Sequence, residues 1–137
     1  MTHDVFISYA TEDKQIADAV CVAVEARGFR CWIAPRDVLA GMRYGEAIID
    51  AIHGSKVMVV VFSSHANAST HISKEVERAA TSDVKIIPLR IENVTPTKSL
   101  DYFLGSVHWL DALTAPLEPH LQNLASSIEK TLTNEPG

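Results

Sequence analysis

The 137-residue sequence lacks several features that mark specialised protein classes. It has two cysteines, Cys21 and Cys31, too few for a disulfide scaffold or a four-cysteine metal site. Both lie in apolar stretches, so buried, inert thiols in a reducing cytosol are the favoured interpretation. No apolar run reaches the roughly 18–20 residues of a membrane span, and no basic segment precedes the first apolar stretch. We therefore expect a cytoplasmic protein with no membrane partner.

Positive charge is also scarce. The chain has 12 lysines and arginines against 17 aspartates and glutamates, a formal net charge of −5. An acidic chain is not attracted nonspecifically to nucleic acid, so we expect no nucleic-acid partner. A hydrophobic content of 47% with 21% charged residues excludes a disordered chain. The length suits one domain, which we place at residues 1–133, followed by a frayed tail or the start of a linker at 134–137.

Common catalytic motifs are missing as well. No Gly-x-Gly-x-x-Gly follows the first apolar run, and no Gly-x-x-x-x-Gly-Lys-Ser/Thr occurs, which excludes the usual dinucleotide and P-loop sites. The six histidines form no His-x-x-x-His pair and have no neighbouring cysteine, so we expect no metal site. The stretch Phe62-Ser63-Ser64 offers neither the phosphoacceptor aspartate of a receiver domain nor the nucleophile elbow of a serine hydrolase.

Short apolar runs alternate with stretches of helical periodicity along the whole chain. The run at 57–62 is apolar without alternation, which is typical of a strand covered on both faces, so we expect it in the centre of a parallel sheet. Pro88 cannot donate a ladder hydrogen bond, so we expect a strand end or a sheet edge there. The runs that predict strands are residues 4–8, 29–33, 57–62, 84–91 and 107–110.

Helical periodicity predicts four helices between and after these strands. Strands alternating with helices indicate right-handed crossovers, and thus a parallel sheet with helices on both faces. Ligands of such sheets bind beyond the carboxyl ends of the strands, which directs attention to loops 9–13, 34–44, 63–71 and 92–100. The predicted helices are residues 16–24, 47–52, 69–82 and 117–132.

Several segments, in their order along the chain, resemble the successive motifs of one family. These segments are Asp4-Val5-Phe6-Ile7-Ser8-Tyr9, Gly28-Phe29-Arg30-Cys31-Trp32, Arg36-Asp37-Val38 with Gly41 and Tyr44, Val59-Val60-Val61-Phe62-Ser63, Ser69-Thr70-His71-Ile72-Ser73-Lys74-Glu75 and Ile86-Ile87-Pro88-Leu89. The series resembles the Toll/interleukin-1 receptor (TIR) domain in its bacterial form and covers nearly the whole chain. The resemblance implies an α/β fold, a flavodoxin-like five-stranded parallel sheet with helices on both faces.

The resemblance implies one of two functions. Many bacterial members cleave NAD between ribose and nicotinamide and release nicotinamide with ADP-ribose or a cyclised form, with NAD as substrate and no cofactor. Other members are noncatalytic, self-associating signalling modules, and the loop 34–43 offers Leu39 and Met42 as apolar handles for such contacts. The two functions are compatible, because head-to-tail TIR–TIR assembly can complete the NAD site from two subunits. We further expect a sensor domain C-terminal to this chain and a role in antiphage defence, with interference in host signalling as a second setting.

The catalytic glutamate of the family aligns with Glu75. Nicotinamide departs as a neutral pyridine, so no general acid is required, and one carboxylate can stabilise the positive charge that develops on the ribose. Glu75 lies at the border of the apolar stripe formed by Ile72, Val76, Ala79 and Ala80. Spacing alone favours a solvated residue paired with Arg78 three positions later, whereas the motif favours catalysis.

The resemblance also implies residues that bind substrate. Tyr9 and Ala10 follow the first strand and are expected to offer backbone contacts. Gly41 and Arg43 belong to the long loop, where Arg43 is either a hydrogen-bond donor to phosphate or a solvated surface residue. Tyr44 either lines the cleft or packs under the following helix.

His71 stands where the family often has tryptophan. Its smaller ring offers less stacking surface to the base or the ribose, and an exposed loop position is the alternative. Trp32, on the second predicted strand, is expected in the core rather than in contact with a ligand.

Overall fold

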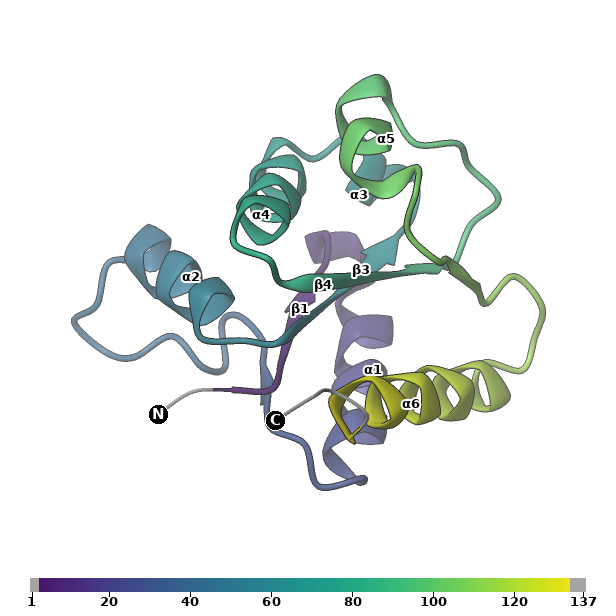
Figure 1. Cartoon of the computed structure of the whole chain (residues 1–137), viewed down its shortest axis with the longest axis horizontal. Helices are drawn as coiled ribbons and strands as arrows, with labels where there is room; N and C mark the ends of the chain where they lie inside the picture. Colours follow the sequence, from purple (N-terminus) through teal and green to yellow (C-terminus); the bar gives the residue numbers. More distant parts are fainter. Residues whose placement is uncertain (1–2, 134–137) are drawn as a thin grey trace.

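The computed structural model describes residues 3–133 of the chain; the tail expected at 134–137 lies outside this range. Within it, five parallel strands form one sheet in the order β2-β1-β3-β4-β5, with helices on both faces (Figure 1). This confirms the predicted flavodoxin-like fold. The strands are β1 (Val5–Ser8), β2 (Cys31–Trp32), β3 (Val57–Phe62), β4 (Lys85–Arg90) and β5 (Leu110–Asp111).

Helices α1 and α6 cover one face of the sheet, and α2, α4 and α5 cover the other (Figure 1). No helix in the described part of the chain is both long and apolar enough to cross a bilayer. The helices are α1 (Lys14–Glu25), α2 (Tyr44–His53), α3 (Ser64–Asn67), α4 (Thr70–Thr81), α5 (Lys98–Leu104) and α6 (Glu118–Thr133), with a short 3-10 turn at Thr11–Asp13.

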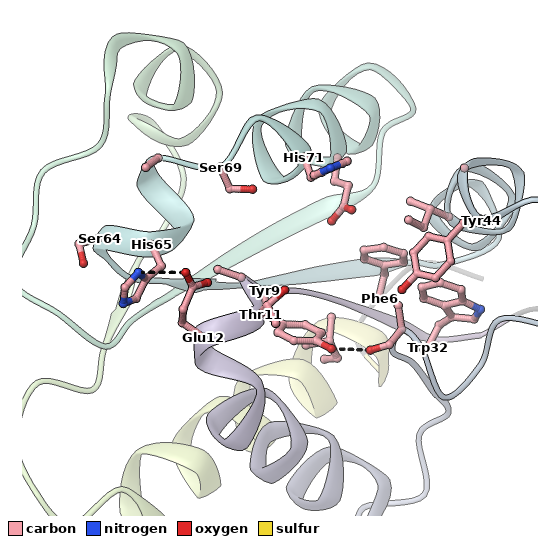
Figure 2. A pocket seen from close by; sticks show the side chains of 17 residues that line it. Phe6, Tyr9, Thr11, Glu12, Trp32, Tyr44, Ser64, His65, Ser69 and His71 are labelled. Atoms are coloured by element: carbon pink, nitrogen blue, oxygen red, sulfur yellow. Dashed lines mark hydrogen bonds and ion pairs between the residues drawn. The ribbon is translucent and has the colours of Figure 1, made fainter.

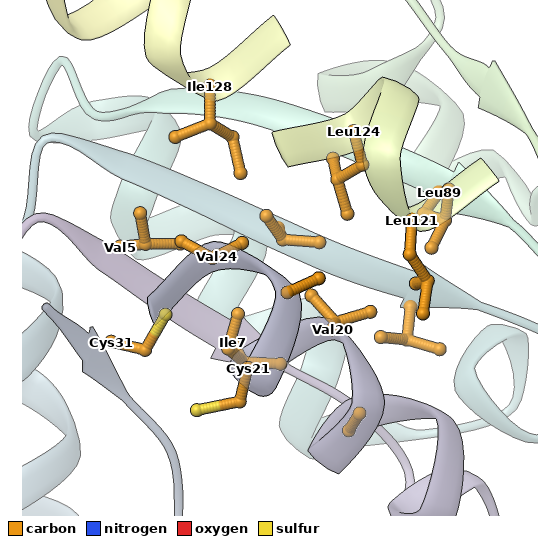
Figure 3. Close-up of a cluster of buried hydrophobic side chains, with 14 of the residues drawn as sticks. Val5, Ile7, Val20, Cys21, Val24, Cys31, Leu89, Leu121, Leu124 and Ile128 are labelled. Atoms are coloured by element: carbon orange, nitrogen blue, oxygen red, sulfur yellow. The ribbon is translucent and has the colours of Figure 1, made fainter. Parts of the chain in front are cut away.

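The central strand is β3, as its unbroken apolar run predicts. All six of its residues are fully buried. The cluster of buried side chains on the face of α1 and α6 includes Val20, Val24 and Leu124 (Figure 3). Val57, Val59 and Val61 belong to this cluster, and the alternate residues of β3 pack under α2, α4 and α5. A strand between two helical layers must be apolar at every position, which explains the missing alternation.

Strand β4 does not end at Pro88, contrary to the sequence-based expectation, but continues to Arg90. The N–H groups of Lys85 and Ile91 point toward β3, so by alternation the nitrogen of Pro88 points to the opposite side. On that side β5 pairs with β4 only from Leu89 onward. Pro88 therefore costs the sheet no ladder hydrogen bond. At Pro88, β4 is a sheet edge only on the side that faces β5, because β3 pairs with its other side.

Three short elements differ from the sequence-based prediction. Strand β5 begins at Leu110, where the apolar run 107–110 ends. Helix α3 lies within the predicted loop 63–71, and α5 begins within the predicted loop 92–100. Elements of two to seven residues carry too few positions for a periodic signal, so tertiary packing decides them. Both outer strands of the sheet, β2 and β5, are only two residues long.

Ser63 links the end of β3 to two other elements and provides a test of this packing. Its buried hydroxyl donates to the carboxylate of Asp13 and accepts the N–H of Ala66 at 3.1 Å, which caps α3. We expect Ser63→Ala to lower the free energy of unfolding by about 1–3 kcal/mol, measured by urea denaturation, because both hydrogen bonds are lost inside the core. The neighbouring Ser64→Ala, at an exposed hydroxyl, should cost less than about 1 kcal/mol. Equal losses for the two variants would contradict this account.

Candidate active site

A pocket of about 670 Å³ opens at the carboxyl ends of β1 and β2, between α2 and the start of α4 (Figure 2). Three of the four loops expected from the topology contribute to its wall: 9–13, 34–44 and 63–71. The fourth loop, 92–100, braces α3 instead. Its Thr95 carbonyl accepts a hydrogen bond from Asn67 at 2.9 Å, and the Thr97 N–H donates to Asn67 at 2.8 Å. The pocket thus lies where parallel α/β sheets bind ligands.

Helix α4 carries Glu75 to the wall of this pocket. Ser69 caps the helix by accepting the N–H of Ile72 at 3.2 Å, which sets the start of the helix and hence the direction of each later side chain. Ile72, Val76 and Ala79 are buried against the sheet, and Glu75 sits half-buried at the border of that stripe, as the periodicity predicts.

The surroundings of Glu75 favour its neutral form. Burial raises the pKa of this carboxyl group to about 7, and a hydrogen bond donated by the hydroxyl of Ser8 opposes that rise. The Ser8 Oγ to Glu75 Oε1 distance is 2.8 Å. The expected alternative of a solvated glutamate paired with Arg78 is not what the structure shows, because Glu75 is half-buried and bonded to a strand.

Aromatic side chains form another wall of the pocket (Figure 2). Trp32 is 5% exposed and stacks on Phe6 with ring centroids 5.1 Å apart, so it belongs to the core as expected, while its edge lines the pocket. Tyr44 lies at the start of α2 and is 52% exposed, so it lines the pocket rather than packing beneath the helix. Tyr9 donates its phenolic hydroxyl to the carbonyl of Ala34, which ties the loop after β1 to the loop after β2.

The predicted site residues separate into two groups. The pocket brings together Glu75, Tyr9, Ala10, Tyr44 and His71.

Gly41 and Arg43 are exposed, belong to the loop before α2 and do not line this pocket. Gly41 has a φ of +82°, a conformation that favours glycine, and Arg43 is the residue before the first turn of α2.

Sequence reasoning missed Ser8, Glu12 and His65. The last two lie across the pocket from the aromatic wall, with His65 Nδ1 and Glu12 Oε2 3.6 Å apart (Figure 2). Ser8 is 1% exposed in an otherwise apolar strand. A polar residue at the carboxyl end of a buried strand is a usable sequence signal, because a buried hydroxyl needs a partner.

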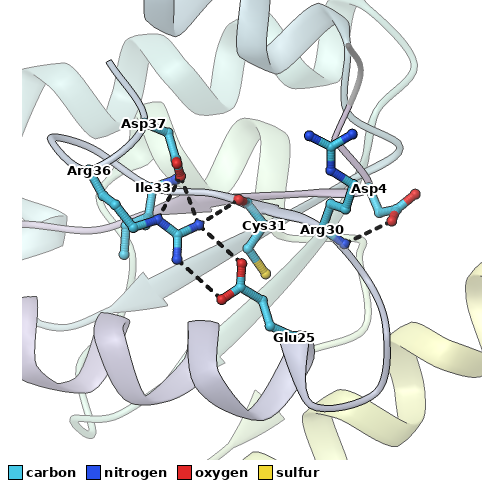
Figure 4. A network of polar contacts seen from close by, with 7 residues as sticks. All are labelled: Asp4, Glu25, Arg30, Cys31, Ile33, Arg36 and Asp37. Carbon is cyan, nitrogen blue, oxygen red and sulfur yellow. Dashed lines mark hydrogen bonds and ion pairs between the residues drawn. The ribbon is translucent and has the colours of Figure 1, made fainter. Parts of the chain in front are cut away.

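A polar network anchors the loop that follows β2 (Figure 4). The Arg36 guanidinium donates to both carboxylate oxygens of Glu25 at 3.2 and 3.1 Å, to the carbonyl of Cys31 at 2.9 Å and to Asp37. Asp37 also accepts the backbone N–H of Ile33 at 2.9 Å. The loop therefore leaves the sheet in a defined direction.

Cys21, Glu25 and Cys31 lie within reach of one another, with one donor atom of each within 4.8 Å of the others. Both cysteines are free and buried. A hydrogen bond with Cys21, together with burial, raises the pKa of the Cys31 thiol. Arg36 already engages both oxygens of Glu25, so its guanidinium would repel a metal cation placed between these three side chains. The protonated thiol of Cys31 is also a poor metal ligand, because metals bind the thiolate.

Comparisons with known proteins agree with this geometry. A family model described as TIR domain matches residues 5–125. The structure is similar to the TIR domain of the Toll-related receptor TRR-2 of Hydra magnipapillata, with a TM-score of 0.78 and 27% identity, covering 93% of this chain and 99% of that one. It is also similar to a metazoan TIR-STING receptor of C. gigas solved in complex with 2',3'-cGAMP, with a TM-score of 0.69 and 27% identity, covering 90% of this chain and 39% of that one.

A sequence relative is the stimulator of interferon genes protein of Magallana gigas, which is 42% identical over 59 residues. The match covers 42% of this chain and spans only 14% of that protein. These named relatives come from animals, so the bacterial form expected from the motifs is not shown. The match over residues 5–125 and the shared fold establish the family: the chain belongs to the TIR domain family.

Proposed function

We propose that this TIR domain cleaves NAD between ribose and nicotinamide and that Glu75 is its catalytic residue. The observation that carries the proposal is the position of Glu75, a half-buried carboxylate in the wall of a 670 Å³ pocket at the carboxyl ends of the strands. Ligand pockets of roughly 300–1,000 Å³ are typical of small molecules and cofactors, so the volume suits a dinucleotide.

The chemistry requires little more than this carboxylate. As the bond to the pyridinium breaks, the bonding electrons stay on nicotinamide, which leaves neutral, and positive charge develops on the ribose. A carboxylate already held in place stabilises that charge more strongly than water does, since it does not have to reorganise. Water or an adenine nitrogen then attacks the ribose carbon, giving linear or cyclic ADP-ribose.

The other walls suit the remainder of the substrate. Tyr44, which is 52% exposed, presents an aromatic ring beside the pocket on which a flat base can stack, whereas Trp32 is buried against Phe6. His71 lies close to Glu75 on α4 and offers a smaller ring. Arg43 lies outside the pocket, so we propose that it reaches a phosphate only when a second copy of the chain docks its loop at this site.

The test is nicotinamide release from NAD by the purified chain over a range of protein concentrations, with products identified by mass spectrometry. We expect the rate to rise more steeply than in proportion to protein concentration, because assembly completes the site. A parallel sample, fused to a domain that forces oligomerisation, should be active even when dilute. No product in either sample would overturn the proposal, and strict proportionality would contradict the part that requires assembly.

A noncatalytic role in signalling assemblies is the second candidate, and the exposed loop before α2 favours it. Leu39 is 71% exposed on a loop whose base is fixed by the Arg36 network. Light scattering of the wild type and of Gly41→Pro tests this role, because proline cannot adopt the φ of +82° found at Gly41. A wild type that assembles without releasing nicotinamide, together with loss of assembly in the variant, supports the noncatalytic role, and unchanged assembly in the variant argues against it.

We propose a place in a longer defence receptor for the intact protein. The C. gigas receptor named above contains a TIR domain and is much longer than this chain, which covers 39% of it. A sensor domain C-terminal to this chain, cytoplasmic location and NAD depletion as an antiphage response are parts of the same hypothesis.

A further inference from the structure

The hydroxyl of Ser8, at the end of a sheet strand, donates a hydrogen bond to the carboxylate of Glu75 on the helix that packs over it. Ser8 is the last residue of β1, and it pairs in register with Val60 of the central strand. Side chains alternate along a strand, so Ser8 shares the face of Phe6, which packs under α2 and α4. Its hydroxyl is therefore directed at the helix that carries Glu75, 67 residues later in the chain.

This contact joins two groups with restricted freedom. Ser8 is 1% exposed and its backbone is held in the sheet, so its hydroxyl has a fixed position. It donates to Oε1 of Glu75 at 2.8 Å, while Oε2 receives no hydrogen bond from the described residues 3–133. One oxygen is thus anchored, and the other remains available to a substrate in the pocket.

We infer that Ser8 is a positioning residue for Glu75: its buried hydroxyl orients the carboxylate and favours its charged form for the NAD cleavage proposed above, on which this inference rests. A hydroxyl donor stabilises an ionised carboxylate more than a protonated one. It thereby opposes the effect of burial, which favours the uncharged form. Ser8 does not meet the substrate, and it acts through Glu75 alone.

Among the described residues, the other titratable groups near Glu75 donate no hydrogen bond to its carboxylate. Tyr9 from the loop after β1, Tyr44 from α2 and His71 from α4 itself line the same pocket, and Glu12 and His65 pair with each other farther along the wall. The hydrogen bond from Ser8 is the contact that opposes the effect of burial on the pKa of Glu75.

The inference is tested with Ser8→Ala by two measurements. Carbon-13 NMR titration of the glutamate carboxyl groups, with Glu75 assigned by its absence in Glu75→Gln, should show the pKa of Glu75 rising by about one to two units above the wild-type value. The acid limb of the pH profile of nicotinamide release should move by the same amount, so the rate at pH 7 falls about tenfold while the rate at high pH recovers. A merely structural role would lower the rate equally at every pH.

Two further variants complete the test. Ser8→Cys has a similar shape and a weaker donor, and we expect an intermediate pKa; it also replaces Ser8→Ala should that variant fail to fold. Ser55→Ala is the matched control, because Ser55 is a buried serine whose hydroxyl donates to the carbonyl of Ala51 at 2.7 Å, just before β3 and away from the pocket. It should leave the pKa of Glu75 unchanged.

An unaltered pKa of Glu75 in both Ser8 variants would overturn the inference, whether or not the chain cleaves NAD. A wild-type chain without activity, but with the expected pKa changes, would instead refute the proposed function and leave the Ser8–Glu75 coupling intact.

Discussion

Replacing Glu75 with glutamine is expected to reduce nicotinamide release from NAD at least about 100-fold. Glutamine keeps the shape of the side chain and an oxygen that can accept the hydrogen bond from Ser8, so the pocket should stay intact. What it removes is the negative charge facing a ribose that becomes cationic. Losing one preorganised electrostatic contact to a transition state costs roughly 10²–10³ in rate. The measurement is the initial rate under conditions in which the wild type is assembled.

Glu77→Gln is the matched control for this experiment. Glu77 lies two positions later on α4 and is exposed, so the variant makes the same chemical change outside the pocket. It should retain wild-type activity within about twofold. A Glu75→Gln protein that assembles and still releases nicotinamide at the wild-type rate would remove Glu75 from the mechanism.

The same substitution is expected to stabilise the fold at high pH. Burial raises the pKa of Glu75 from its ordinary value of 4.5 to about 7. Between these two values the folded protein holds a proton that the unfolded chain has released, so folding becomes less favourable as the pH rises through this window. Above pH 7 the full cost of a buried charge is present, about 3 kcal/mol at most.

Glutamine cannot titrate, so Glu75→Gln escapes this cost. We expect its free energy of unfolding to exceed that of the wild type by about 1–3 kcal/mol at pH 8, with the gain disappearing near pH 4. Urea denaturation of both proteins at several pH values measures the difference, and Glu77→Gln again serves as control. A gain in the free energy of unfolding that does not vary with pH would show that burial does not destabilise the charged form of this carboxyl group. Loss of activity with gain of stability in one variant is typical of a residue retained for function.

Much of the architecture could be predicted from the sequence. The unbroken run 57–62 predicted the central strand, and the apolar stripe of Ile72, Val76, Ala79 and Ala80 predicted the helix that carries Glu75. Both patterns are local consequences of burial, so they can be read from one segment at a time.

The parts that could not be predicted depend on contacts between distant segments. The partner of Glu75 is Ser8, on another element, whereas spacing along the chain offered only Arg78. Pro88 fits inside β4 because β5 begins beyond it, a fact of register that no local pattern contains. Likewise, Arg43 is close to Tyr44 in the sequence, yet Tyr44 lines the pocket and Arg43 does not.

The two-residue outer strands restrict how this domain can associate. Long, flat strands at the rim of a sheet act as templates for further strands and lead to continuous, fibre-like addition. In β2 and β5 such a template is too short to hold an incoming strand, and Pro88 removes a donor from the part of β4 that β5 leaves uncovered. We therefore expect any contact between copies to form through loops and helix surfaces rather than through added strands.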